Sequence, residues 1–191
     1  MRMTVLAPWI LAFATGIAAV EAAGEDTVSG LRRTVEMPVH EALVGVIRAP
    51  GTEVATFTTD GCSGGLSSTW FVVADLFPDF SAAHMERPPW EACCITHDRV
   101  YHNAAGATEA DQSFDARLAA DNELRRCVVE TGDERKSDIA QHYGLSEAQV
   151  QLAYGVISDA MFNAVRFGGS PCSGLPWRWG YGFPACFLRS E

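Results

Sequence analysis

A histidine and an aspartate stand side by side in a segment with helical spacing, where their side chains could do acid–base and metal chemistry. They close the run 93–98 (Cys-Cys-Ile-Thr-His-Asp). Cys94, His97, Asp98 and Tyr101 are spaced i, i+3, i+4 and i+7, so they share one helix face. A histidine can act as a general base near neutral pH, and a carboxylate beside it can hold a hard cation. An isolated pair of this kind is more often a surface pair, so the assignment depends on further residues.

Asp121 is the candidate partner of His97. It lies within a second helical segment, whose apolar stripe consists of Phe114, Leu118, Leu124 and Val128. Asp121 interrupts this stripe between Leu118 and Leu124. A buried carboxylate is costly unless it is paired or hydrogen-bonded.

Helix geometry tests this pairing. If the two helices run antiparallel and Cys93 is bonded to Cys127, His97 lies roughly 6 Å along the axis and Asp121 roughly 9 Å in the same direction. Asp115 would lie about 18 Å along, which is too far. We therefore predict that Asp121 orients His97, as the acid of a catalytic triad does, and that Tyr101 donates its hydroxyl to Asp121.

The elements that must position these residues are helices. Prolines at 88 and 89 open the first, and the others have polar caps and glycine stops. The predicted spans are Trp90 to about His102, Thr108 (capped with Asp111) to Thr131-Gly132-Asp133, and Ser146 (capped with Gln149) to Gly168-Gly169, with a polar loop before Ser146. The stretch Val35–Ile47 also has helical spacing. Little strand signal remains, so the fold class is mainly α.

Composition and charge narrow the function. Of 191 residues, 48% are hydrophobic and 20% are charged, which is typical of a globular domain. The formal net charge is −10. A chain this acidic lacks the basic surface that nucleic acid requires, and it is poorly suited to strongly anionic membranes.

The N-terminus predicts export. Arg2 precedes an apolar run from Thr4 to Val20, and small residues follow at Ala22 and Ala23. We predict a signal peptide at 1–23, a leader, linker or short helix at 24–53, and the functional domain at 54–191. An uncleaved membrane anchor is the alternative for the first segment. No other segment is long and apolar enough for a permanent span.

Six cysteines in an exported chain favour disulfides. They are Cys62, Cys93, Cys94, Cys127, Cys172 and Cys186. An even count suits a secreted or periplasmic protein. Six cysteines allow 15 pairings, among which spacing alone does not choose.

Together these features resemble the secreted phospholipases A2, in particular a prokaryotic-type domain of that family. The run 93–98 resembles the active-site motif Cys-Cys-x-x-His-Asp, and Tyr101 and Asp121 stand where the family has a tyrosine and an aspartate. Residues 60–65 (Asp-Gly-Cys-Ser-Gly-Gly) resemble its calcium loop, although Ser63 replaces a usual glycine. The resemblance covers roughly Thr59 to Val128.

The resemblance implies calcium-dependent hydrolysis of the sn-2 ester of phospholipids in aggregates or membrane surfaces. His97 would activate water and Asp121 would orient it. Asp98 and the carbonyls of Gly61, Ser63 and Gly65 would hold Ca²⁺, and the Ser63 N–H would stabilise the oxyanion. The implied fold is a pair of antiparallel helices cross-linked by a disulfide, with the calcium loop and a further C-terminal helix. The implied disulfides are Cys62–Cys94 and Cys93–Cys127, which leaves Cys172 with Cys186.

Two other classes remain open. The first is a catalytically weak binding module or toxin with the same fold. The second is a zinc protein that uses Cys93, Cys94, His97 and His102, which would require free thiolates.

Several residues outside the motif allow two readings. The aromatic residues of the tail could bind a lipid surface or cover the hydrophobic core. A second aromatic set could line a channel for the acyl chain or pack in the core. The tail residues are Trp177, Trp179, Tyr181 and Phe183, and the second set is Trp70, Phe71 and Trp90. We expect the remaining histidines, His40, His84, His102 and His142, to be surface residues. The sequence does not predict an oligomeric state.

Overall fold

Helices make up the regular secondary structure of residues 30–62 and 88–186, the parts of the chain that the computed structural model describes. Residues 30–47 are helical, and the later elements are α4 (Glu91–His102), a 3₁₀ turn η1 (Ala104–Gly106), α5 (Ala110–Tyr143) and α6 (Glu147–Gly168). Within those residues there is no strand, so the prediction of a mainly α fold is confirmed.

The chain divides into two units, Met1–Met37 and Pro38–Glu191, and the contacts below all lie within the second. No helix in the described part of the chain is long and apolar enough to cross a bilayer. The predicted signal peptide and residues Ser63, Gly65, Trp70, Phe71 and His84 lie outside the described residues.

Helix α4 begins one residue later than predicted and ends at His102 as predicted. Its first turn is fixed by the Glu91 N–H, which donates to the Pro88 carbonyl at 3.0 Å. Glu91 in the first turn and Arg99 in the last complement the helix dipole. The helix turns Cys93, Cys94 and the His97 face inward.

Helix α5 is longer than the sequence indicates, and the predicted end at residues 131–133 is wrong. The helix continues through Gly132 to Tyr143, and Gly144 ends it in the left-handed conformation with φ 65°. Gly132 serves helix packing instead: a Cβ there would come 2.4 Å from Cγ of Tyr154 on α6. A close helix–helix approach therefore explains the glycine that resembles a stop signal.

The start of α5 also differs from the prediction. Glu109 is the N-cap and makes no side-chain capping bond. The Thr108 N–H donates at 3.4 Å to Gln112, one residue beyond the predicted partner Asp111.

Helix α6 has the predicted bounds. The Ser146 hydroxyl accepts from the Gln149 N–H, and the Gln149 side chain accepts from the Ser146 N–H, which completes the capping box. Val150, Met161 and Val165 are buried, whereas Val156 is 62% exposed.

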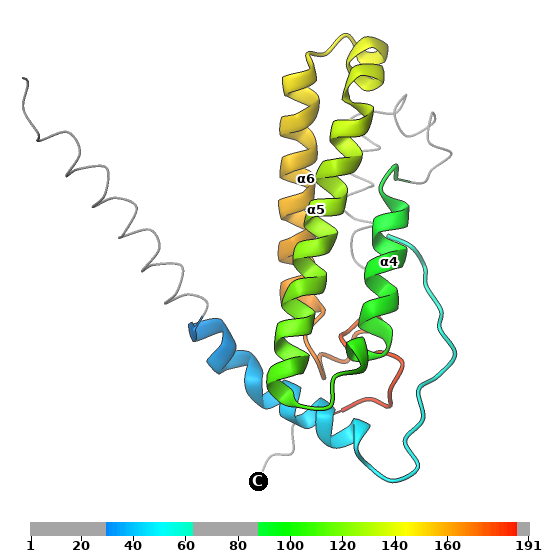
Figure 1. Ribbon diagram of the computed structural model, residues 1–191, viewed down its shortest axis with the longest axis vertical. Helices are drawn as coiled ribbons and strands as arrows, with labels where there is room; N and C mark the ends of the chain where they lie inside the picture. The colour runs from blue at the N-terminus through cyan, green and yellow to red at the C-terminus, as the bar shows by residue number, and fades with distance from the viewer. Residues whose placement is uncertain (1–29, 63–87, 187–191) are drawn as a thin grey trace, which may run out of the picture. The chain divides into compact units, whose positions relative to one another are not determined.

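The three long helices run antiparallel in sequence order. Cys93 is bonded to Cys127, and His97, four residues later, contacts Asp121, six residues earlier than Cys127. Helices α4 and α5 therefore run in opposite directions. Arg125 pairs with Asp159 on α6 at 2.6 Å, and Asp133 pairs with Gln151 at 2.7 Å, which gives the same relation between α5 and α6. Helix α5 lies between the other two (Figure 1).

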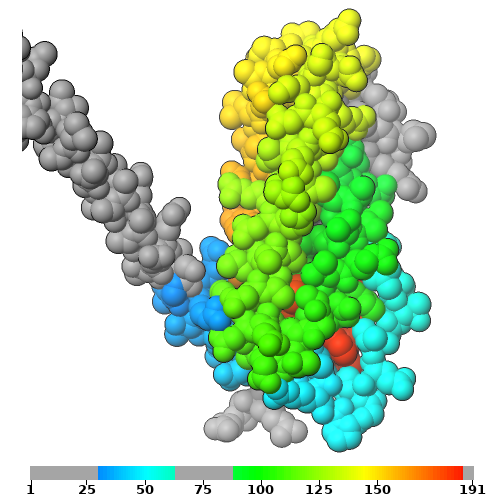
Figure 2. Space-filling view, viewed as in Figure 1, coloured from blue at the N-terminus to red at the C-terminus, as the bar shows by residue number. Residues whose placement is uncertain are grey.

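The residues after α6 return to the end of α4. The Gly180 N–H donates to the Tyr101 carbonyl at 2.7 Å, and the Gly182 N–H donates to the His102 carbonyl at 2.8 Å. Trp179 is fully buried, so for this residue the core reading is confirmed. The tail reaches the surface between the segment before Cys62 and the helices (Figure 2).

Two histidines expected at the surface are buried, and that prediction is wrong for them. His40 Nδ1 lies 2.8 Å from Ser113 Oγ, which also accepts from Trp179 Nε1 at 2.8 Å. His102 is covered by the tail, with the Tyr181 ring 5.0 Å from its own. The polar contact of His40 with Ser113 and the aromatic packing of His102 against Tyr181 thus explain why both rings lie in the core. His142 is exposed, as expected.

Candidate active site

The histidine and the aspartate that the sequence singles out are in direct contact. His97 Nε2 lies 2.9 Å from Asp121 Oδ1, and the Tyr101 hydroxyl donates to the same oxygen at 2.6 Å. Asp121 is fully buried and His97 is 7% exposed. The bond fixes the ring so that Nε2 faces the carboxylate and Nδ1 faces the opposite side.

Two arginines that were not predicted from the sequence complete this network. Arg166 Nη1 donates to Asp121 Oδ2 at 2.9 Å. Arg117 Nε donates to the Tyr101 hydroxyl at 3.2 Å, and its Nη2 donates to the Val165 carbonyl at 2.9 Å. Arg117 does carry a signal, because it stands four residues before Asp121 on the same helix face. Arg166, at the end of α6, has no comparable signal.

The surroundings of His97 shift its pKa in the direction that favours the protonated ring. Burial lowers the pKa of His97, but its hydrogen bonds and charge interactions with Asp121 and Asp98 outweigh burial and raise the pKa above 6.5. Burial and the charge of Asp121 raise the pKa of Tyr101 well above 10, so its hydroxyl remains a donor. His97 therefore holds a proton more readily than a free histidine does, while Tyr101 keeps its own proton.

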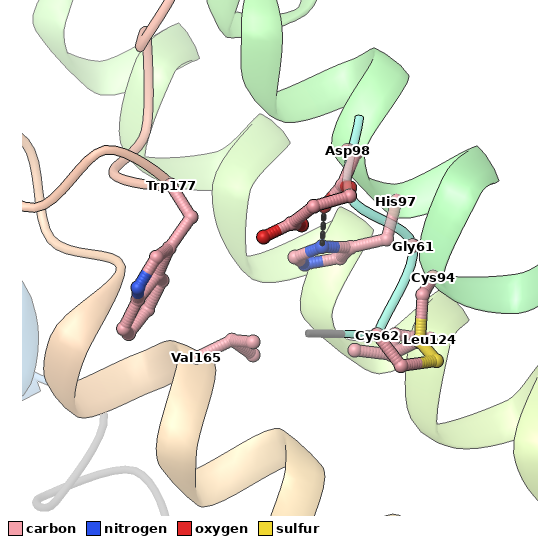
Figure 3. Close-up of a pocket in the computed structure, with 9 residues that line it drawn as sticks. Gly61, Cys62, Cys94, His97, Asp98, Leu124, Val165 and Trp177 are labelled. Atoms are coloured by element: carbon pink, nitrogen blue, oxygen red, sulfur yellow. Dashed lines mark ion pairs between the residues drawn. A yellow bond between two sulfur atoms is a disulfide. The ribbon is translucent and has the colours of Figure 1, made fainter. Parts of the chain in front are cut away.

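The free side of His97 faces a small hollow (Figure 3). Its Nδ1 lies 3.9 Å from Asp98 Oδ1. Gly61, Cys62, Leu124, Val165 and Trp177 are among the lining residues. The hollow has a volume of ≈ 20 Å³. Because a water needs about 10–15 Å³, this space has room for a water beside the histidine.

The segment before Cys62 is held against α4 at the hollow. The Cys62–Cys94 disulfide joins the two segments. The Thr59 hydroxyl donates to Asp98 Oδ2 at 2.6 Å and accepts from the Gly61 N–H at 3.0 Å. Gly61 has φ +69°, and a Cβ there would come 3.0 Å from Glu91 Oε1, so the turn favours glycine.

Asp98 and Gly61 could together contribute to a metal site. Both border the hollow, and both can offer an oxygen atom to a metal, the ligand type that a hard cation such as Ca²⁺ prefers. No group of three His, Cys, Asp or Glu converges among the residues described here. A site made of one carboxylate and loop carbonyls needs no such group. Ser63 and Gly65, the other proposed ligands, lie outside the described residues.

The zinc alternative is wrong because all six cysteines form disulfides. The pairs are Cys62–Cys94, Cys93–Cys127 and Cys172–Cys186. The first two are those that the resemblance implies, and the third is the pair that they leave. No thiolate is therefore available to a metal. Such bonds suit an oxidising compartment.

Trp90 belongs to the core. It is 4% exposed, and its ring packs edge-on against Tyr154 at 5.6 Å. This contact favours the packing reading of Trp90 over an acyl-channel wall.

Comparisons with protein-family models, with curated proteins and with solved structures found no match to this chain.

Proposed function

We propose that this protein is a calcium-dependent phospholipase A2 that hydrolyses the sn-2 ester of glycerophospholipids, in a secreted or periplasmic location. One observation carries the proposal. His97 contacts the buried Asp121 through Nε2, and its Nδ1 faces a hollow of ≈ 20 Å³ that Asp98 borders. A histidine oriented by a buried acid beside space for one water is the arrangement that general-base hydrolysis requires.

In the proposed reaction His97 Nδ1 accepts a proton from the water in the hollow, and the water oxygen bonds to the ester carbonyl carbon. The bond from that carbon to the alkoxy oxygen then breaks, and the proton passes from Nδ1 to the leaving lysophospholipid. Asp121 stabilises the imidazolium between these steps, as a triad acid does. Tyr101 and Arg166 keep the Asp121 carboxylate in place.

The carbonyl oxygen also requires stabilisation as it gains charge. A bound Ca²⁺ would act as the Lewis acid for this oxygen. Asp98 and the carbonyls of Gly61, Ser63 and Gly65 would hold the ion, and the Ser63 N–H would donate to the oxyanion. The sn-2 position and the choice of calcium rest on the family resemblance.

Fatty-acid release from neutral mixed micelles, with Ca²⁺ or with a chelator, tests the proposal. Activity should require Ca²⁺, and His97→Gln should reduce the rate at least 10²- to 10⁴-fold because the general base is lost. His142→Gln is the matched control, since His142 is exposed and lies outside the site. Wild-type activity in His97→Gln would overturn the mechanism. A binding module or toxin of the same fold predicts no release under any condition.

A further inference from the structure

A larger hollow opens beside the one at His97, and the proposed hydrolysis does not use it. Its volume is ≈ 240 Å³. It is lined by Thr58, Thr59, Asp60, Asp98, Pro176, Trp177 and Tyr181. Asp60, Asp98 and Trp177 also border the hollow at His97, so the two spaces are neighbours. A substrate whose ester lies at His97 can therefore extend into this second space.

Two aromatic side chains in its wall are held in place by the fold. A Cβ on Gly168 would come 2.2 Å from Cη2 of Trp177, so the absence of a side chain there makes room for the indole. The Tyr181 hydroxyl donates to the Thr58 carbonyl at 2.6 Å, and its ring packs edge-on against His102 at 5.0 Å. The aromatic surface is thus ordered before any ligand arrives.

The charge of this hollow is negative. Asp60 and Asp98 are among its lining residues, and none of those residues is basic. Burial, followed by the charges of Asp98 and Asp60, raises the pKa of Tyr181 to about 12, while Arg99 opposes this shift. The Arg99 guanidinium lies 4.6 Å from the ring centre of Phe57, which does not line the hollow. A cation with apolar substituents therefore fits these walls.

We propose that this second hollow is a headgroup site for the quaternary ammonium of choline phospholipids, an inference that rests on the proposed function. Aromatic faces bind methylated ammonium groups through cation–π attraction. Asp98 would be committed to the metal, so Asp60 supplies the remaining counter-charge. The net charge of −10 agrees with a substrate surface that is zwitterionic rather than anionic.

The first test compares hydrolysis of phosphatidylcholine and phosphatidylglycerol in neutral-detergent micelles. Wild type should prefer phosphatidylcholine. Trp177→Leu and Asp60→Asn should each lower the ratio of the two rates by about threefold to tenfold. The ratio is the readout because Trp177 also borders the hollow at His97, where a change affects both substrates alike.

Phe167→Leu and Asp159→Asn are the matched controls. Phe167 is 93% exposed on α6 and does not line the hollow, so its replacement tests a general effect of surface aromatics on micelle binding. Asp159 is paired with Arg125 away from the hollow. Both controls should keep the wild-type ratio. An equal loss in Phe167→Leu and Trp177→Leu would overturn the headgroup site.

The second test measures binding without catalysis. Phosphocholine and glycerol phosphate are titrated into calcium-free protein while the indole N–H signals are followed by NMR, with Trp177→Leu to assign that residue. Phosphocholine should shift the Trp177 signal, and glycerol phosphate should not. Phosphocholine binding without any lipid hydrolysis would support the headgroup site and overturn the proposed function. Hydrolysis with an unchanged Trp177 signal would overturn the site alone.

Discussion

Arg166 and Asp121 form an ion pair inside the helix bundle, with Arg166 Nη1 2.9 Å from Asp121 Oδ2. His97 and Tyr101 contact the other oxygen of the same carboxylate. Asp121 thereby connects the end of α6 to the inner face of α4. The orientation of the proposed base therefore depends on Arg166, which stands 45 positions after Asp121 in the chain.

Replacing Arg166 should cost both stability and activity. Arg166→Met leaves the fully buried Asp121 carboxylate without its arginine, and breaking a buried ion pair costs about 3 kcal/mol. The measurement is the free energy of unfolding in urea, together with the rate of fatty-acid release. Arg126→Met is the control, because Arg126 forms exposed pairs with Glu123 and Glu130. The control should keep the midpoint of wild type, and equal losses in the two variants would contradict the role of Arg166.

The pH profile should report the partner of His97. The base must be neutral to accept a proton, so activity falls as the pH drops through its pKa, which lies above 6.5. Asp121→Asn removes the leading cause that raises this pKa, so the midpoint should move to lower pH. The rate should also fall, though less than in His97→Gln, because Asp121 orients the base rather than taking the proton. A midpoint that moves to higher pH in Asp121→Asn would contradict the assignment.

Two helical glycines should respond in opposite directions to the same change. Gly132→Ala should destabilise the fold by about 1–3 kcal/mol, because its Cβ would meet the Tyr154 ring at 2.4 Å. Gly155→Ala has open space around its Cβ and should stabilise by about 0.5–1 kcal/mol, through helix propensity alone. Thermal and urea unfolding of the two variants checks this contrast. A stabilising Gly132→Ala would show that α5 and α6 do not pack closely there.

The sequence predicts the parts of this fold that depend on local chemistry. The capping box of Ser146 and Gln149 fixes the start of α6, and the prolines before Trp90 open α4. The contact between His97 and Asp121 follows from helix rise once the Cys93–Cys127 cross-link, which the family resemblance implies, is assumed.

Features that depend on packing at a distance were not predictable. In the sequence Gly132 resembles a helix stop. Only the structure shows that the Tyr154 ring occupies the space that a side chain at position 132 would need. His40 and His102 were expected at the surface because their partners, Ser113 and the tail, are remote in sequence. Arg117 and Arg166 were not predicted as buried residues because arginine is usually exposed. Arg117 is buried because it donates to a carbonyl at the end of α6, and Arg166 because it pairs with the buried Asp121.

The hydrogen bond from the Tyr181 hydroxyl to the Thr58 carbonyl also bears on how the protein is made. It spans 123 residues, and it ties the segment before Cys62 to the tail. A ribosome adding about 5–20 residues per second needs roughly 6 to 25 seconds to synthesise the residues between them. During that interval the nascent chain contains Thr58 and lacks Tyr181. The wall of the larger hollow can therefore form only after Tyr181 has been synthesised.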